Sequence, residues 1–273
     1  MKRLWIAGAV CAVLLQLECC AAAGAASTAD DRIFLSADGA TLTGTDGGGG
    51  GSLAWLHNFD ANTLAGVGAE HQGLGPAQWT FGSLNGALTV GPDDQKYSLY
   101  ADAHGGAGDD GPRAFHYHIE NAGVIGTYFH HLSAQLEDRR IDVETTHGNL
   151  PKIGLSNLWD PHWLTSAAYS HSVNGNLGTR LGQLRVDHYG AAMNVLAGVS
   201  FGQASPWVLN NLAQIVAPAH HLKEGYAGIS KPVPRWRGEW LLVGDYQDLA
   251  GSKHVIITLS YNFHVGAVEP ATR

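Results

Sequence analysis

The segment His254–Phe263, with the sequence HVIITLSYNF, decides the fold class. Every second position is apolar or aromatic: Val255, Ile257, Leu259, Tyr261 and Phe263. The intervening positions are mostly polar, and this period of two is typical of a β-strand whose two faces meet different surroundings. The segment therefore predicts a strand with one apolar face and one polar face.

Other parts of the chain repeat this alternation, and no segment after residue 26 has the period of an amphipathic helix. Within Phe115–Ile119, the aromatic and aliphatic positions are expected to share one face and His116 and His118 the other. The alternation is also seen in Tyr97–Asp102, Tyr128–Leu136 and Trp236–Tyr246.

The pattern predicts about fourteen strands, with twelve as the alternative. The expected ranges are 32–44, 51–59, 63–72, 77–90, 95–104, 113–120, 124–137, 149–158, 163–173, 177–188, 191–202, 221–231, 235–247 and 253–263. Tight connections, such as Asp60–Asn62 and Asn121–Gly123, alternate with longer ones, such as Asp138–Gly148 and Gln203–His220. Short turns at one end and long loops at the other are typical of a single antiparallel transmembrane β-barrel. A soluble periplasmic β-sandwich is the alternative, because its strands also alternate.

Composition narrows the choice of function. The chain has 273 residues, of which only 15% are charged, and 36 are glycine. The net charge of −8 argues against a nucleic-acid partner, since phosphates require a basic excess. A hydrophobic fraction of 45% excludes wholesale disorder.

Residues 1–25 are expected to be a secretory signal peptide, and residues 26–273 the barrel domain. Lys2 and Arg3 precede the apolar stretch Leu4–Leu15, and A-x-A cleavage sites end at Ala23 and Ala25. All three cysteines lie in this leader, so a disulfide framework or a thiolate metal site is excluded in the mature chain. The expected location is the bacterial outer membrane.

The closing segment ITLSYNF, residues 257–263, resembles the last strand of bacterial outer-membrane β-barrel proteins. The resemblance implies that the barrel assembly machinery reads this strand through Tyr261 and Phe263, and that lipid surrounds the barrel. One departure is that ten residues follow Phe263, where the family usually ends. In length and layout the chain is similar to the YaiO-type family, some members of which accompany exopolysaccharide systems.

Charged and polar residues on the strands are candidates for the lumen, because an arginine facing lipid at the bilayer midplane costs about 2–4 kcal/mol. Such residues would form salt-bridge networks that rigidify the barrel, or would line a polar conduit. The mixed-sign cluster Glu137–Asp142 is expected to be a solvated loop. The lumen-facing polar candidates are His116, His118, His131, Arg185, Asp187, Glu239 and Asp245.

An enzymatic alternative rests on the segment FHHLSAQ. His131 and Ser133 lie two residues apart, which would place imidazole and hydroxyl on one face of a strand, as in outer-membrane lipid hydrolases. Ala134 follows where those hydrolases have Asn. No metal or cofactor is expected, because His116 and His118 lack a third ligand that the sequence could place.

The sequence thus predicts a non-enzymatic outer-membrane barrel, either a narrow channel or an accessory to surface-polymer export. The connection Gln203–His220 is apolar for a loop and is expected to fold into the barrel mouth, with a short helix over Trp207–Ile215. The alternative is an extra hairpin that extends the two neighbouring strands above the membrane.

Overall fold

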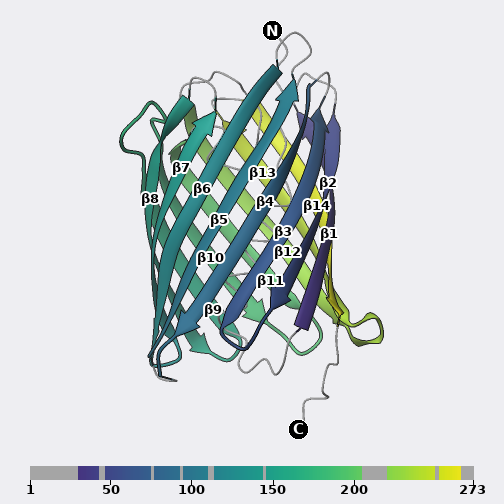
Figure 1. Cartoon of the computed structure of the whole chain (residues 1–273), viewed down its shortest axis with the longest axis vertical. Helices are drawn as coiled ribbons and strands as arrows, with labels where there is room; N and C mark the ends of the chain where they lie inside the picture. Colours follow the sequence, from purple (N-terminus) through teal and green to yellow (C-terminus); the bar gives the residue numbers. More distant parts are fainter. Residues whose placement is uncertain are drawn as a thin grey trace.

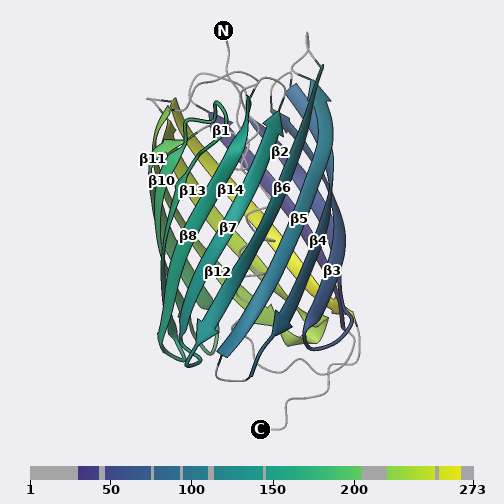
Figure 2. The same ribbon diagram turned by 60° about the vertical axis from the view of Figure 1, so that its left-hand side comes forward.

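The computed structural model is a closed antiparallel β-barrel of fourteen strands, in which each strand pairs with its neighbours in sequence and β1 closes against β14. The structure describes residues 30–42, 47–74, 77–92, 95–109, 114–143, 146–204, 220–249 and 252–265. The strands are inclined to the barrel axis (Figures 1 and 2). The predicted fold class and strand number are confirmed, and the alternative of a sandwich is wrong because the sheet closes on itself.

The strand bounds are β1 Asp30–Leu42, β2 Gly48–Asn58, β3 Thr63–Leu74, β4 Ala77–Val90, β5 Gln95–Asp109, β6 Ala114–Tyr128, β7 Leu132–Val143, β8 Thr146–Asp160, β9 Trp163–His171, β10 Arg180–Tyr189, β11 Asn194–Ala204, β12 His220–Val233, β13 Gly238–Leu249 and β14 Ser252–Val265. A short 3-10 helix, Pro234–Trp236, joins β12 to β13. We call the end at which β1 begins and β14 ends the lower end, as drawn in Figure 1, and the opposite end the upper end. Among the described residues, no helix is long and apolar enough to cross a membrane.

β14 shows how the sequence separates the two faces of the wall. Ile257 and Leu259 are more than half exposed and point outward, whereas His254, Ile256 and Ser260 are buried on the lumen side. Both assignments follow the alternation of the sequence. β14 continues to Val265, two residues beyond the expected end at Phe263. Recognition of this strand by the assembly machinery stays a prediction.

Outward-facing apolar side chains form a belt around the barrel, with aromatic residues concentrated at the lower end. Tyr97 on β5 packs edge-on against Tyr128 on β6, with ring centroids 6.1 Å apart, and Tyr261 packs against Phe263 at 4.3 Å. Trp55, Trp159, Trp163 and Trp236 are exposed near the same end. An apolar band bordered by aromatic residues is the surface that a transmembrane barrel presents to lipid and to the membrane interface.

The predicted boundary between β6 and β7 is wrong. The expected turn Asn121–Gly123 lies inside β6, and the actual turn is Phe129–His131, where Phe129 and His130 have φ angles of 54° and 62°. Few L-residues adopt this left-handed conformation, and neither is the Gly, Asn or Asp that usually marks it. The sequence therefore carries no standard turn signal here.

The expected long connection Asp138–Gly148 is also wrong, because β7 extends to Val143 and β8 begins at Thr146. The charged segment Glu137–Asp142 is thus strand rather than loop, with Glu137 buried and Asp138 exposed. The proposed plug and helix within Gln203–His220, the signal peptide and the tail after Val265 lie outside the described residues.

Candidate functional site: the barrel lumen

The lumen surface is the candidate functional site, since every strand contributes alternate side chains to it. Its charged residues form several clusters. Arg185 and Asp187 lie on the lumen face of β10, where two strand positions on one face bring them into contact. Arg185 donates from Nε to Asp187 Oδ2 at 2.8 Å and from a terminal nitrogen to Oδ1 at 2.6 Å. This bidentate geometry is the strongest form of an arginine–carboxylate pair.

Glu239 and Asp245 also lie on the lumen face, both on β13. Glu239 accepts hydrogen bonds from Ser230 and, at 3.2 Å, from the Asn194 amide. Asp245 accepts one at 2.8 Å from Gln247 Nε2, which also donates to Glu224 at 2.9 Å. One amide group therefore bridges two carboxylates on β12 and β13.

The expectation that His116 and His118 face the lumen is wrong. Both are exposed, while Tyr117 and Ile119 between and beside them are buried on the lumen side of β6. His118 Nε2 lies 2.9 Å from Glu120 Oε1 on the outer surface. The physical reason is that the upper half of β6 carries its polar face outward, the reverse of the pattern in a lipid-covered strand.

His131 does not face the lumen either, because it lies in the β6–β7 turn and is exposed. Its Nδ1 is 2.6 Å from the carbonyl oxygen of Phe129. Ser133 faces the lumen, and its hydroxyl lies 3.1 Å from that of Thr127. His131 and Ser133 therefore have separate partners and do not form the dyad that a hydrolase needs.

A network on β5, β7 and β8 centres on the buried carboxylate of Glu137. Tyr100 donates its hydroxyl to Glu137 Oε2 at 2.6 Å, and Gln135 donates to the same oxygen at 3.2 Å. Arg139 and Lys152 lie 3.6 and 3.7 Å from the Glu137 carboxylate oxygens. We call these five residues the Glu137 network; it satisfies its carboxylate with two cations and two neutral donors.

A second group, near the upper end of β1, β3, β4 and β6, combines carboxylates with aromatic rings. Gln72 Nε2 donates to Asp38 Oδ1 at 3.0 Å and also to Glu70. Phe81 lies directly opposite Glu70 in the β3–β4 register. We call the group the acidic–aromatic cluster; its members are Asp38, Glu70, Gln72, Trp79, Phe81 and Tyr117, and all six are buried.

The sequence analysis did not identify the acidic–aromatic cluster. Asp38, Glu70 and Trp79 lie in the strands expected at 32–44, 63–72 and 77–90. The period of two can assign each of these residues to a face of its own strand. The cross-strand register that joins them, such as Gln72 opposite Trp79, is a property of the folded sheet. Periodicity alone does not supply it.

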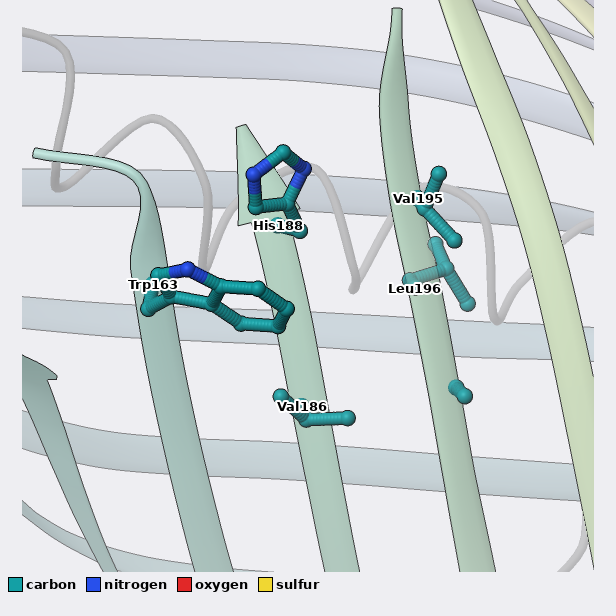
Figure 3. A pocket seen from close by; sticks show the side chains of 6 residues that line it. Trp163, Val186, His188, Val195 and Leu196 are labelled. Atoms are coloured by element: carbon teal, nitrogen blue, oxygen red, sulfur yellow. The ribbon is translucent and has the colours of Figure 1, made fainter. Parts of the chain in front are cut away.

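An apolar recess of about 340 Å³ lies over β9, β10 and β11 near the lower end (Figure 3). Trp163 and His188 form part of its lining, with ring centroids 4.5 Å apart. Both point outward, so the recess belongs to the lipid-facing surface rather than to the lumen. Within the described part of the chain, no group of three or more His, Cys, Asp or Glu side chains could hold a metal ion.

Comparisons with known proteins support the class of fold. No family model and no curated protein sequence matches the chain. Among solved structures it is similar to the CymD monoaromatic hydrocarbon channel, with 11% identity over 98% of this chain and 95% of that chain and a TM-score of 0.59. It is also similar to a mutant of the TodX monoaromatic hydrocarbon channel (9% identity, 88% and 91% coverage, TM-score 0.55). The Ralstonia pickettii toluene transporter TbuX gives 8% identity, 88% and 90% coverage and a TM-score of 0.53.

The chain therefore has the fold of the outer-membrane β-barrel channels. At these sequence identities the likeness defines the architecture and does not identify a transported solute. The YaiO-type resemblance is not confirmed.

Proposed function

We propose that the protein is a narrow, passive channel of the bacterial outer membrane for small solutes. One observation carries the proposal: a closed wall has an apolar belt outside and buried polar side chains inside. A polar lumen replaces part of the water around a solute, which is how a barrel lowers the barrier to crossing a bilayer. The similarity to hydrocarbon and toluene channels supports a transport role.

We infer a narrow lumen because many of the side chains that face it are buried. Gln72, Ile141 and His254 each expose 1% or less of their surface although they point inward. The proposed solute is accordingly small. An accessory role in exopolysaccharide export stays a prediction that no described residue favours over the channel.

The proposal is tested by single-channel recording in planar lipid bilayers, using protein whose folding is verified by heat-modifiable gel mobility. We expect small, discrete conductance steps from the folded protein and none from a heat-unfolded sample. Liposome swelling with solutes of graded size should then give a low size limit. A folded and inserted protein that conducts no ion and passes no solute would contradict the proposal.

A further inference from the structure

The two carboxylates of the acidic–aromatic cluster lack a positive partner. Among the described residues, neither Asp38 nor Glu70 forms a salt bridge. Their shared partner is the neutral amide of Gln72. Asp38 exposes only 9% of its surface and Glu70 only 7%. Buried carboxylates close to each other favour an added positive charge, because an amide dipole compensates only part of their charge.

A comparison with the Glu137 network shows that the missing positive charge is particular to the acidic–aromatic cluster. There a single carboxylate lies within 4 Å of two cationic side chains, Arg139 and Lys152. In the acidic–aromatic cluster two carboxylates share one neutral donor. The same barrel thus neutralises one lumen carboxylate with its own cations and leaves the Asp38–Glu70 pair without one.

Aromatic rings lie beside these carboxylates. Trp79 is directly opposite Gln72, and Phe81 directly opposite Glu70. The rings of Phe81 and Tyr117 have centroids 5.6 Å apart and meet edge to face, at an interplanar angle of 74°. Carboxylates flanked by aromatic faces are the surroundings that an organic ammonium group prefers, since its charge attracts both.

Four polar atoms of the cluster have no hydrogen-bond partner within the described part of the chain: Asp38 Oδ2, Gln72 Oε1, Trp79 Nε1 and the Tyr117 hydroxyl. The residues that carry them are all at least nine-tenths buried. Two of the atoms accept hydrogen bonds, Trp79 Nε1 donates, and the Tyr117 hydroxyl does either. Since buried polar groups are normally paired, these atoms point to a polar ligand with a hydroxyl group, which both donates and accepts a hydrogen bond.

We propose that the acidic–aromatic cluster binds a small organic cation of the amino-alcohol class, in which an ammonium group is joined to a hydroxyl group. The ammonium group lies between the carboxylates and the rings, and the hydroxyl oxygen accepts from Trp79 Nε1 or Tyr117. The inference rests on the proposed channel only in that the solute reaches the cluster through the lumen. The side chains of the cluster face the lumen, so a cation that permeates the barrel passes them.

The test is isothermal titration calorimetry of the folded barrel in detergent with choline. Its neutral control is the isostere of choline in which carbon replaces the ammonium nitrogen. We expect saturable binding of choline and roughly tenfold weaker binding of the isostere, since only choline gains the charge and cation–π attraction. Glu70→Gln and Asp38→Asn should each weaken choline binding by about tenfold, because each removes one charge without changing shape.

Two further variants test whether choline binds at this cluster or is attracted by the overall negative charge of the lumen. Glu239→Gln neutralises a lumen carboxylate on β13 and should leave choline affinity unchanged. Thr258→Arg introduces a guanidinium on β14 directly opposite Asp38, and it should abolish binding by supplying the missing charge from within the chain. Heat-modifiable mobility verifies that each variant is folded.

Absence of choline binding to the folded wild-type barrel overturns the inference. So does binding of the isostere as tight as that of choline, which would indicate a site for a neutral ligand. An equal loss of affinity in Glu239→Gln would do the same by showing a non-specific charge effect. Conductance without choline binding removes this inference alone, whereas choline binding without conductance removes the proposed channel alone.

Discussion

The wall formed by β5–β8 and the wall formed by β9–β11 differ in height and in outer surface. β5, β6 and β8 each have 15 residues, whereas β9, β10 and β11 have 9, 10 and 11. On β6, β7 and β8 of the tall wall, outward positions are mainly apolar in the lower half and become polar above it, as at His118, Arg140 and His147. On the short wall they are mainly apolar along nearly the whole length, from Val195 through Val199 to Phe201 on β11.

From this difference we infer that lipid covers a belt of similar height on both walls and that the tall wall projects beyond it. Leu155 and Ile153 on β8 belong to the lipid-covered part, and His147 on the same face lies above it. In the upper part of the tall wall the outer face is polar and exposed, and the inner face is packed. Aromatic and aliphatic residues such as Tyr117 and Ile141 therefore point inward there.

The largest effect is expected for Leu155→Arg in the lower half of the tall wall. A guanidinium facing lipid near the midplane should lower the free energy of unfolding by about 2–4 kcal/mol and reduce the assembled fraction. The measurement is the yield of heat-modifiable protein after refolding into lipid vesicles. His147→Arg, on the same face of the same strand, should assemble like wild type. Equal losses at both positions would mean that the bilayer covers the entire tall wall.

The next largest effect concerns the inside of the tall wall. Glu137→Gln removes the carboxylate that lies within 4 Å of Arg139 and Lys152 and accepts from Tyr100, and it should destabilise the barrel by about 1–3 kcal/mol. Asp138→Asn is the matched control, since Asp138 is the exposed outward neighbour on β7. Urea-induced unfolding in vesicles measures both. A Glu137→Gln variant as stable as the control would show that the Glu137 network does not rigidify this wall.

The two walls also explain how far the sequence could predict the structure. On β14 the alternation gave the strand and both faces, because lipid and lumen impose opposite polarity there. On β6 the same rule gave the wrong face for His116 and His118, because water rather than lipid covers the outer surface of the projecting part. The charged segment Glu137–Asp142 suggested a loop, although its charges alternate between lumen and solvent.

The site was harder to predict than the fold. Arg185 and Asp187 were identified as a pair because two residues on one strand face are neighbours by geometry alone. Asp38, Glu70 and Tyr117 lie on three different strands, and their proximity depends on the register of the intervening pairs. Because a shift of one residue exchanges the two faces of a strand, no single-strand pattern fixes such a cluster.

A smaller effect is expected at the upper end of the short wall. Phe201→Arg places a charge close to the expected membrane interface, where it should cost no more than about 1 kcal/mol because the side chain reaches water. Refolding yields in vesicles should therefore fall only slightly, in contrast to Leu155→Arg. A loss as large as that of Leu155→Arg would place Phe201 deep in the bilayer, and the short wall would then end inside the membrane.

The smallest effect is expected at the lower end, where the walls do not differ. There an aspartate side chain accepts hydrogen bonds from the backbone in two different turns. In the β2–β3 turn, Asp60 Oδ1 accepts from the backbone N–H groups of Asn62 and Thr63, both at 2.7 Å. In the β8–β9 turn, which joins the two walls, Asp160 Oδ1 accepts from His162 at 2.6 Å and Trp163 at 3.0 Å. Both carboxylates are exposed, so removing either should lower the Tm only slightly.

The pH dependence of the Tm should reveal how much the Asp60 carboxylate stabilises its turn. The backbone N–H of Asn62, with the Thr63 hydrogen bonds, holds the pKa of the Asp60 carboxyl below its usual value. A pKa lowered by folding stabilises the protein above the unfolded pKa of about 3.9, and this stabilisation is lost as the pH falls through the folded pKa. The Tm difference between wild type and Asp60→Ala should therefore be present at neutral pH and shrink in strong acid, while Asp60→Asn should show no such titration. A difference that stays constant from neutral pH to strong acid would mean that the ionised carboxylate does not stabilise the β2–β3 turn, and that chain geometry alone sets this turn.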